Sequence, residues 1–251
     1  MAERGRVVVS GASSGIGLAT AQRFAAEGWR VCVTARREPL LRELVAVLPG
    51  ENHLLVPGDY AQPETAEAIG ALVSERWGGL DALVNCAGVF IGGDPITTPL
   101  EAWRRPLDIM LNGAIHLTRM AAPLMHDGGR IIHVTSIHST HAERGASAYA
   151  MAKAALDQYC RGLAVELAPR GILVNAIAPG FVDTPMSVMD GVNELETEWF
   201  RTNYIEGHHL PLQRAARPKE IAGVAWFLAG PDASYITGQV LVVDGGLTIT
   251  F

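Results

Sequence analysis

Short, continuously apolar runs alternate with longer amphipathic segments along the whole 251-residue chain. The runs are rich in β-branched residues and lack polar alternation, which is typical of parallel strands that are covered on both faces. A strand followed by a helix and then by another strand indicates a right-handed crossover. The pattern therefore predicts an α/β fold with a Rossmann-type, doubly wound parallel sheet of about seven strands.

The predicted elements fill most of the chain and leave no linker, so we expect a single domain over residues 1–251. Strands are expected at 7–10, 30–34, 53–57, 82–85, 130–135, 172–177 and 239–243, and helices at 16–27, 39–48, 65–77, 100–126, 148–167 and 218–228. Residues 180–210 interrupt this order, because they show no strand pattern and only one or two short helical patterns. Insertions of this kind commonly form a lid or a substrate loop.

Composition and charge narrow the classes of function. The chain is 49% hydrophobic and 18% charged, which favours a folded core, and its net charge of -6 gives no footprint for nucleic acid. No apolar run approaches the ~20 residues of a membrane-spanning helix, and the polar start of the chain does not resemble a signal peptide. We therefore expect a cytoplasmic protein with neither a membrane nor a nucleic-acid partner.

The cysteines and histidines carry no metal signature. Cys32, Cys86 and Cys160 are scattered and odd in number, so they are interpreted as reduced core thiols. His208 and His209 are adjacent, but no partner ligands accompany them. We predict no metal site.

A candidate nucleotide site follows the first predicted strand. Residues 10–17 read Ser-Gly-Ala-Ser-Ser-Gly-Ile-Gly, and a helix is predicted to begin there. Glycines let the backbone approach a pyrophosphate, and the amino terminus of a helix offers unpaired N–H groups. The spacing differs from Gly-x-Gly-x-x-Gly, and a tight strand–helix turn without a ligand would also need glycines. The position directly between strand and helix favours nucleotide binding.

The end of the second strand indicates which nucleotide is bound. An NAD-selective fold usually places an acidic residue here. This chain has Ala35 and then Arg36 and Arg37, whose guanidinium groups are suited to a 2′-phosphate, and Ser13 offers a hydroxyl contact. NADP is the preferred prediction. NAD stays open, because the two arginines also fit a solvated charge pair at a helix start.

Tyr149, Lys153 and Ser136 supply the candidate chemistry. The first two are four residues apart in a helical segment, so they project from one face. A phenol alone titrates near pH ~10, and a neighbouring cation or hydrogen bonds to its charged form lower that value. Ser136 ends an upstream apolar run and offers a hydroxyl to a carbonyl oxygen. The three residues predict a proton-transfer site, whereas the helical pair by itself would be an exposed pair without chemistry.

The order of these motifs resembles the short-chain dehydrogenase/reductase family, in its compact single-domain branch, over nearly the whole chain. The resemblance is carried by the glycine-rich turn at 10–17, Gly58-Asp59, Asn85-Cys86-Ala87-Gly88, Ser136, Tyr149-x-x-x-Lys153 and Pro179-Gly180. It implies an NAD(P)-dependent oxidoreductase that interconverts a ketone or aldehyde with an alcohol, with Tyr149 as general acid or base.

The resemblance also implies individual roles. Ser136 would orient the substrate carbonyl, Tyr149 would exchange the proton, and Lys153 would bind the nicotinamide ribose and lower the pKa of the tyrosine. Asp59 would bond the adenine amino group, and Thr184 would meet the nicotinamide carboxamide. The residues expected to hold the cofactor are Gly11, Ser13, Ser14, Gly15, Ile16, Gly17, Arg36, Arg37, Asp59, Tyr60, Asn85, Ala87, Gly88, Tyr149, Lys153, Pro179, Gly180, Val182 and Thr184.

Two positions depart from the family pattern. The family usually carries an asparagine seven residues after a tryptophan, and counting from Trp103 gives Met110. Asn112 lies ~200° further around a helix and should not face the same site, although a one-turn shift in the alignment would favour it. We expect Met110 to weaken the family's proton relay without abolishing it, because that relay uses a backbone carbonyl here. Cys86 stands where a second asparagine is common and is interpreted as packing.

Substrate contacts are expected from Ser136, His138 and Tyr149. His138 would bond a polar substrate group, and the alternative is a loop histidine bonded to the backbone. Acidic residues in 180–210 outnumber Arg201, which disfavours an anionic carrier; they are Asp183, Asp190, Glu194, Glu196, Glu198 and Glu206.

An NADPH-linked carbonyl reductase acting on a small-molecule carbonyl or alcohol is the favoured function. The alternatives are a 3-oxoacyl-thioester reductase, an NAD-linked polyol or sugar dehydrogenase, and a nucleotide-sensing protein without catalysis. The family resemblance further implies a homo-oligomer, either a dimer or a tetramer.

Overall fold

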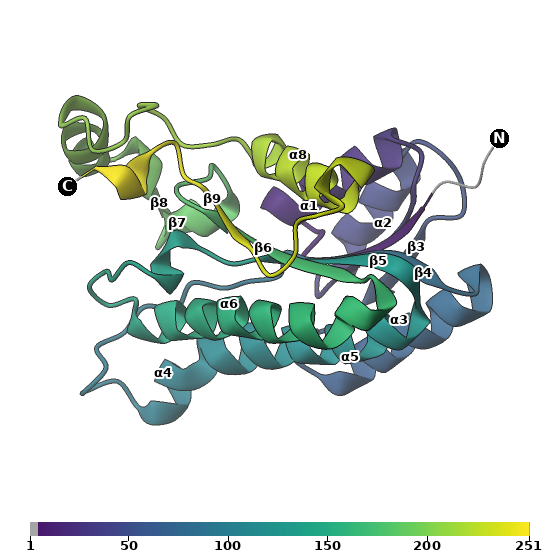
Figure 1. The fold of residues 1–251 in the computed structure, drawn as a ribbon. Helices are drawn as coiled ribbons and strands as arrows, with labels where there is room; N and C mark the ends of the chain where they lie inside the picture. Colours follow the sequence, from purple (N-terminus) through teal and green to yellow (C-terminus); the bar gives the residue numbers. More distant parts are fainter. Residues whose placement is uncertain (1–4, 251) are drawn as a thin grey trace.

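The computed structural model describes residues 5–250, and a seven-stranded parallel sheet forms its centre (Figure 1). The strand order is β3-β2-β1-β4-β5-β6-β9, so the chain runs outward from β1 and then returns to its other side. This reversal is the doubly wound topology. The predicted α/β class and the parallel sheet are both confirmed.

The strands lie close to their predicted positions, and only β5 begins more than two residues away from its prediction. They are β1 (Arg6–Ser10), β2 (Arg30–Ala35), β3 (Leu54–Pro57), β4 (Leu80–Asn85), β5 (Met125–Val134), β6 (Leu173–Pro179) and β9 (Val240–Val243). The main helices are α1 (Gly15–Ala26), α2 (Glu38–Val47), α3 (Pro63–Trp77), α4 (Leu100–Leu107), α5 (Gly113–Leu124), α6 (Ser147–Leu167) and α8 (Pro218–Ala229).

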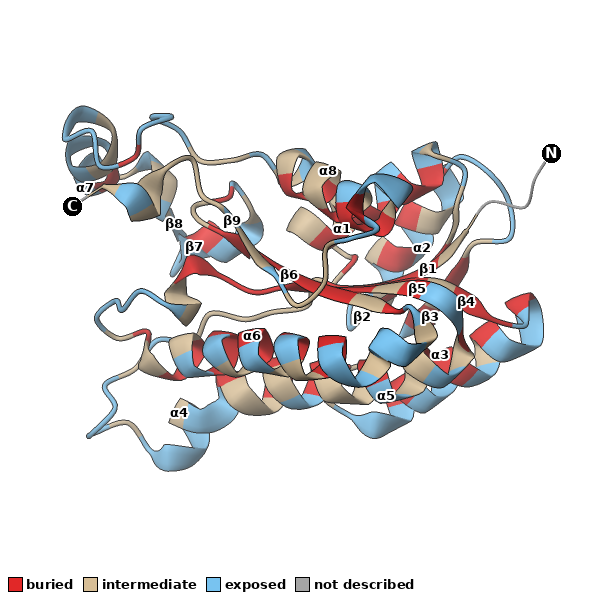
Figure 2. Cartoon of the chain, in the orientation of Figure 1, coloured by how far each residue is buried: buried red, intermediate tan, exposed pale blue. Residues whose placement is uncertain are grey.

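The helices cover both faces of the sheet. Helices α1, α2 and α8 lie on one face, and α3, α4, α5 and α6 lie on the other (Figure 1). Successive strand residues point to opposite faces, so Val8 belongs to the core under α3, α5 and α6, whereas Val7 and Val9 belong to the core under α1 and α8. The inner strands and the inward sides of the helices are accordingly buried, whereas the edge strand β9 is only partly covered (Figure 2). This explains why the strands are continuously apolar in sequence.

The long helix predicted at 100–126 is wrong in two respects. It is divided into α4, a π-helical stretch (Asp108–Asn112) and α5, and its last two residues belong to β5. Pro106 inside α4 has no N–H to donate, which interrupts the regular hydrogen bonds just before the π-helical stretch. Pro123 likewise lies in the last turn of α5.

Residues 180–210 contain the predicted short helices, but the expectation of no strand is wrong. A two-stranded antiparallel hairpin joins β7 (Val188–Met189) to β8 (Val192–Asn193). Asp190 and Gly191 form its turn with φ values of 50° and 80°. An Asp-Gly pair is a recognised hairpin signal, because both residues tolerate positive φ. Helix α7 (Glu198–Phe200) and a π-helical turn (Arg201–Glu206) follow.

The carboxyl-terminal segment after β9 packs against the end of this region. The Leu212 N–H donates to the Gly245 carbonyl at 3.1 Å, and the Thr250 hydroxyl donates to the His209 carbonyl at 2.7 Å. The polar start of the chain (residues 1–4) and Phe251 lie outside the described residues. No helix within 5–250 has the length and apolarity needed to cross a membrane.

Gly17 tests the packing of α1 on the turn that precedes it. A Cβ at Gly17 would collide with the carbonyl oxygen of Gly11 and would lie 2.9 Å from that of Ser10. Gly17→Ala should therefore lower the free energy of unfolding by about 1–3 kcal/mol, measured by urea denaturation without nucleotide. Gly223 in α8 has open space around its Cα, so Gly223→Ala should be neutral or stabilising by up to ~1 kcal/mol. Equal losses in both variants would contradict the close packing.

Candidate active site

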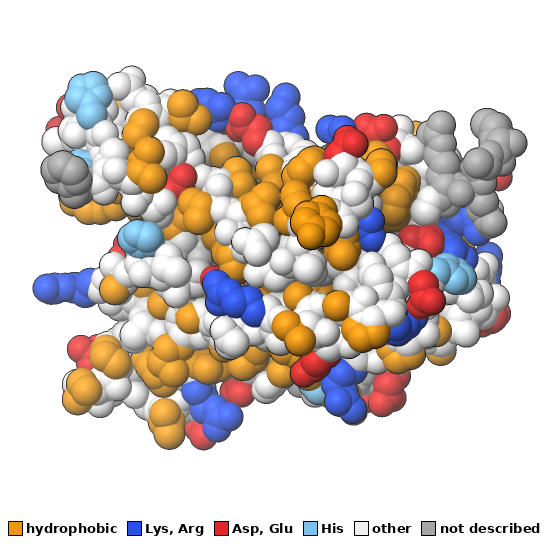
Figure 3. Space-filling view, viewed as in Figure 1, with side chains coloured by type: hydrophobic (Ala, Val, Ile, Leu, Met, Phe, Trp, Pro, Cys, Tyr) orange, Lys and Arg blue, Asp and Glu red, His pale blue; other side chains and the backbone are white. Residues whose placement is uncertain are grey.

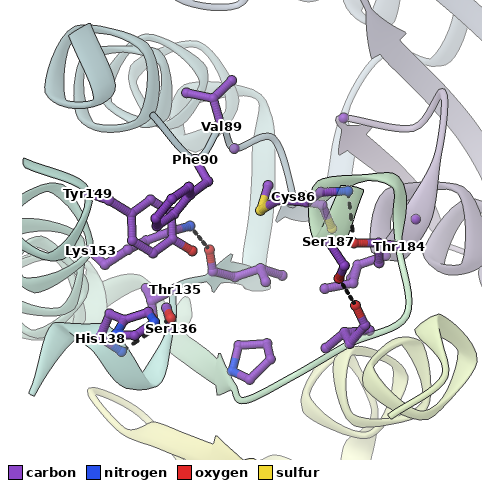
Figure 4. Close-up of a pocket in the computed structure, with 18 of the residues that line it drawn as sticks. Cys86, Val89, Phe90, Thr135, Ser136, His138, Tyr149, Lys153, Thr184 and Ser187 are labelled. Atoms are coloured by element: carbon purple, nitrogen blue, oxygen red, sulfur yellow. Dashed lines mark hydrogen bonds between the residues drawn. The ribbon is translucent and has the colours of Figure 1, made fainter. Parts of the chain in front are cut away.

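A cavity of about 1090 Å³ opens at the carboxyl ends of the strands. Its walls come from the segments that follow each of the seven strands of the sheet, and from residues of 180–210. Doubly wound sheets bind ligands at this edge, because the parallel strands all end there. Figure 4 shows Tyr149, Lys153 and Phe90 on one side of the cavity and Cys86 and Thr184 on the other.

The glycine-rich turn forms one end of the cavity. Gly11 has φ 67°, and a Cβ there would lie 2.8 Å from the Cα of Ala87. The Ser10 hydroxyl holds this approach, because it accepts hydrogen bonds from the N–H groups of Cys86 at 3.1 Å and Ala87 at 3.2 Å. Ser14, at the start of α1, makes no side-chain cap, and the first turn carries no acidic residue. The helix N–H groups and the bare backbone therefore fit a pyrophosphate.

The arginines after β2 lie at the same end. The Arg37 guanidinium donates to the Ser13 hydroxyl at 2.9 Å and to the Ser14 hydroxyl at 2.8 Å. Arg36 and Arg37 are exposed, and both line the cavity. A cationic group is thus held directly beside the glycine-rich turn, where a guanidinium can pair with a phosphate.

The predicted chemical residues come together at the inner end of the cavity. Ser136, Tyr149 and Lys153 are 7%, 7% and 4% exposed. The Lys153 ammonium donates to the Val134 carbonyl at 2.9 Å and lies 5.5 Å from the centre of the Tyr149 ring. The Ser136 hydroxyl oxygen accepts the His138 N–H at 3.2 Å, which leaves its own proton to donate.

Burial is the main cause of the pKa shifts of Tyr149 and Lys153. It raises the pKa of Tyr149, and the hydrogen bond with Ser136 opposes that rise only in part. Burial also lowers the pKa of Lys153 to about 8, against the opposing charge of Asp157. The net pKa of Tyr149 is therefore raised, and the expectation that Lys153 lowers it stays a prediction. The ammonium is directed at the Val134 carbonyl, and desolvation of the phenol outweighs its influence.

His138 lines the cavity. The alternative interpretation required its ring to be bonded to the backbone, and no such bond is found among the described residues. Its Nε2 lies 3.1 Å from the Glu143 carboxylate, and its ring meets the Tyr149 ring edge-on at 5.9 Å between centres. The hydrogen bond and the charge of His138 lower the pKa of Glu143. The pair places a polar group beside the phenol.

Met110, which stands seven residues after Trp103 where the family usually has an asparagine, lies next to the site. It is fully buried in the π-helical stretch, whereas Asn112 is exposed. A Cβ built on Gly88 would lie 3.6 Å from both the Met110 sulfur and the Lys153 nitrogen. Met110 therefore faces the lysine, and Asn112 does not.

Asn85 is the predicted cofactor residue that does not line the cavity. Its carboxamide oxygen accepts from the Ser10 hydroxyl at 2.6 Å, and its nitrogen lies 3.4 Å from His133 Nδ1. These three residues are neighbours in the strand register and form a buried polar row across β1, β4 and β5. Asn85 thus braces the strand ends instead of closing the cleft.

The other predicted cofactor residues all line the cavity. Asp59 follows Gly58, whose N–H donates to the carbonyl of Ala35 at 3.0 Å, and Tyr60 donates from its hydroxyl to the Ala87 carbonyl at 3.0 Å. Thr184 approaches the glycine-rich turn from the opposite side, because a Cβ at Gly15 would lie 3.1 Å from its methyl group. Ser136, His138 and Tyr149, which are predicted to contact the substrate, line the same cavity.

Three residues that line the cavity were not among the predicted site residues. Phe90 packs its ring 5.3 Å from Tyr149, and Tyr204 reaches the cavity from the π-helical turn. Glu194 also lines the cavity, where burial and the charge of Glu143 raise its pKa. No local spacing links Tyr204 and Glu194 to the site, because the fold brings them there from a separate segment, whereas Phe90 follows Gly88 by only two residues. Within residues 5–250, no cluster of three His, Cys, Asp or Glu side chains is arranged to hold a metal.

Comparisons with known proteins agree with this geometry. The family described as "Enoyl-(Acyl carrier protein) reductase" matches residues 11–248. An uncharacterised short-chain type dehydrogenase/reductase from Sinorhizobium fredii is 40% identical over 245 residues, which are 96% of this chain and 43% of that longer protein. The 3-oxoacyl-[acyl-carrier-protein] reductase FabG of Thermotoga maritima is 35% identical over 247 residues, which are 96% of this chain and 97% of that protein.

A solved structure is similarly close. The L-sorbose reductase of Gluconobacter frateurii, complexed with NADPH and L-sorbose, is 33% identical with a TM-score of 0.88, and the match covers 98% of this chain and 97% of that one. The sheet and its cavity define a Rossmann-type oxidoreductase that uses a nicotinamide nucleotide. The chain belongs to the short-chain dehydrogenase/reductase family, whose enzymes act on CH–OH or carbonyl groups with NAD(P).

His133 in the buried polar row should make the protein sensitive to acid. Burial lowers its pKa to about 4, with a smaller contribution from the Lys153 charge. In the unfolded chain this histidine takes up a proton near pH ~6.5, whereas in the folded protein it stays neutral down to pH ~4. The free energy of unfolding therefore falls as the pH falls from ~6.5 to ~4. The loss attributable to His133 should reach about 3 kcal/mol at pH ~4. His133→Gln should flatten this part of the stability–pH curve, measured by chemical denaturation.

His126 provides the matched control, because it is an exposed histidine at the start of β5. His126→Gln should keep the wild-type slope between pH ~6.5 and ~4. A His133→Gln slope that equals the wild-type slope would contradict the buried, neutral histidine.

Proposed function

We propose that the protein is an NADPH-linked reductase of a ketone or aldehyde, which acts as a single domain with residues 180–210 as its substrate lid. The observation that carries the proposal is a single cavity with the candidate chemical residues at one end and the candidate phosphate site at the other. Ser136, Tyr149 and Lys153 converge at the inner end, and the glycine-rich turn with Arg37 forms the other end. The spacing of these groups along one cleft suits an extended dinucleotide with a carbonyl substrate beside it.

The cofactor would lie along the cleft between these ends. The backbone around Gly11, Gly15 and Gly17 would bind the pyrophosphate, and Arg36, Arg37 and Ser13 would bind the 2′-phosphate. Asp59 would meet the adenine, while Lys153 and Thr184 would meet the nicotinamide end. When bound, the nicotinamide supplies or accepts the hydride. The similar L-sorbose reductase was solved with NADPH, which supports this choice of nucleotide.

The protein's own part in the reaction is to orient the substrate and to move a proton. The Ser136 hydroxyl donates to the substrate carbonyl oxygen, because its oxygen accepts the His138 N–H and its own proton remains available. The Tyr149 hydroxyl then gives its proton to the alkoxide that develops on that oxygen. The raised pKa of Tyr149 keeps it protonated at neutral pH, as a proton donor in reduction requires. The Lys153 ammonium stabilises the phenolate that remains.

A sugar or polyol oxidoreductase is the second candidate. The His138–Glu143 pair beside Tyr149 favours it, because a carboxylate and an imidazole together accept and donate hydrogen bonds to hydroxyl groups. The same region disfavours a 3-oxoacyl-carrier substrate, since Glu143 and Glu194 set two carboxylates against the single cation Arg144 and leave no basic patch for an anionic carrier among the described residues there. The intact arrangement of Tyr149 and Lys153 disfavours a sensor without catalysis.

A homo-oligomer in the cytoplasm is also proposed. Hydrophobic side chains gather on the face that carries β9 and the end of α8 (Figure 3). Phe227, Tyr235 and Val242 are 40%, 102% and 52% exposed. Exposed apolar side chains grouped in this way commonly mark an interface with a second protein chain. The oligomeric state can be measured by sedimentation.

Tyr149→Phe tests the proton transfer. Removal of the hydroxyl should lower the rate of NADPH-dependent ketone reduction by ~10²–10⁴-fold, because a general acid contributes that much. Binding of NADPH, followed by fluorescence, should change little. A variant that reduces a panel of ketones and aldehydes at the wild-type rate would refute the proposed role of the tyrosine.

Arg37→Ala tests the preference for NADPH. Loss of a charge-assisted hydrogen bond should raise the KM for NADPH by about 10–100-fold and leave the KM for NADH nearly unchanged. Arg42 is the matched control, because it is exposed in α2, pairs with Glu38 and does not line the cavity. Arg42→Ala should leave both KM values unchanged. Equal effects of Arg37→Ala on the two nucleotides would favour the NAD-linked alternative.

A further inference from the structure

Lys153 has a buried partner of opposite charge. Lys153 is 4% exposed and Asp157 is 3% exposed, and no other Asp, Glu, Lys or Arg within 5–250 is buried. Both lie on α6, four residues apart, so their side chains are neighbours on the same helix face. That face of α6 packs on the sheet beside β5 and β6. Its neighbouring residues Leu156 and Cys160 belong to the same core cluster as Ile131 of β5 and Val174 of β6.

Asp157 has no hydrogen-bond partner that would explain its burial. Its buried Oδ1 is unpartnered among the described residues, and it makes no ion pair within contact distance. A carboxylate taken out of water without hydrogen bonds is strongly destabilising unless a positive charge offsets it. The Lys153 ammonium is the one buried cation in the described part of the chain. Its charge is therefore what makes the buried carboxylate tolerable.

Lys153 depends on Asp157 in the same way, because the other groups around the ammonium carry no negative charge at neutral pH. Burial raises the pKa of the Cys86 thiol to about 12 and raises that of the Tyr149 phenol. His133 on β5 has a pKa of about 4 and is neutral. The Val134 carbonyl accepts one hydrogen bond from the Lys153 ammonium. Met110 presents a sulfur atom at the position where the family usually has an asparagine.

We propose that Asp157 is a positioning residue that keeps Lys153 positively charged inside the protein. It acts through space along one turn of α6 and supplies the negative charge that the surroundings of the lysine otherwise lack. The charge pairing itself is a property of the fold, whereas its consequence for catalysis rests on the proposed function. A neutral Lys153 would not stabilise the Tyr149 phenolate, so the carboxylate preserves the active form of the site.

The pKa of Lys153 makes this dependence measurable. At a pKa of about 8, half of the lysines are already neutral at that pH. Loss of the Asp157 charge lowers the value further, and a fall of about one unit would leave roughly fivefold less of the charged form at pH ~8.

A double-mutant cycle on stability tests the pairing without substrate. Thermal unfolding at pH ~7 and without nucleotide would be measured for the wild type, Asp157→Asn, Lys153→Met and the double variant. Asp157→Asn should lower Tm in the wild type, because it leaves the ammonium unpaired. The same change should leave Tm unchanged or raise it in Lys153→Met, because it removes an unpaired carboxylate. If Asp157→Asn alone does not fold, a double variant that folds shows the same coupling.

Additive effects in this cycle would overturn the proposal. Glu166→Gln supplies the matched control, because Glu166 is an exposed carboxylate on the same helix. It removes the same charge from α6 and should shift Tm equally, and only slightly, in the wild type and in the Lys153→Met background.

The pH profile of reduction tests the consequence for catalysis. Activity of the wild type should decline as the pH rises through about 8, since Lys153 loses its proton there. In Asp157→Asn this decline should move to lower pH, with about fivefold slower turnover at pH ~8 and little change at pH ~6. Asp157→Glu should restore the wild-type profile, and KM for the ketone should stay constant.

The two experiments separate the failure of each claim. A decline at unchanged pH in Asp157→Asn, in an active enzyme, would overturn the positioning role, because a merely structural change lowers activity at every pH alike. A wild type that reduces no carbonyl at any pH would overturn the proposed function instead. The stability cycle would still decide the charge pairing in that case.

Discussion

The arrangement of the site depends on the burial of one ammonium group at the end of β5. Lys153 can stay charged there only because the Val134 carbonyl accepts its hydrogen bond at 2.9 Å and a carboxylate lies one turn further along α6. The same helix places Tyr149 one turn before the lysine, and the same strand end leads directly into Ser136. A shift of α6 along the sheet would therefore move Tyr149 and Lys153 together away from Ser136 and the Val134 carbonyl.

The nucleotide end is built by a different physical device. There the backbone itself is the binding surface, because Gly11 and Gly17 allow β1, α1 and the segment after β4 to meet without side chains between them. Ser10 and Asn85 brace this meeting with a buried hydrogen bond of 2.6 Å. The two ends belong to one cleft because all seven strands are parallel, so that every segment after a strand emerges at the same edge.

The sequence predicted the elements and the chemical residues well where the signals are local. Seven strands, the glycine-rich turn and the Tyr149–Lys153 spacing were all read from neighbouring positions and were found in place. The division of the helix at 100–126 was missed, because the apolar pattern continues through Pro106 and the π-helical stretch. The hairpin around Asp190 and Gly191 was missed although its turn signal was present, because its strands are only two residues long.

What the sequence by itself determined is the order of secondary structure, the class of fold and the identity of the residues that carry the chemistry, since periodicity and motif spacing are properties of neighbouring residues. The tertiary structure alone decided how these residues titrate and what surrounds them. The raised pKa of Tyr149, the pairing of His138 with Glu143 and the isolation of Asp157 with Lys153 are sums over groups from several segments. Burial and electrostatic fields depend on every element packed around a group, and no local pattern encodes that sum.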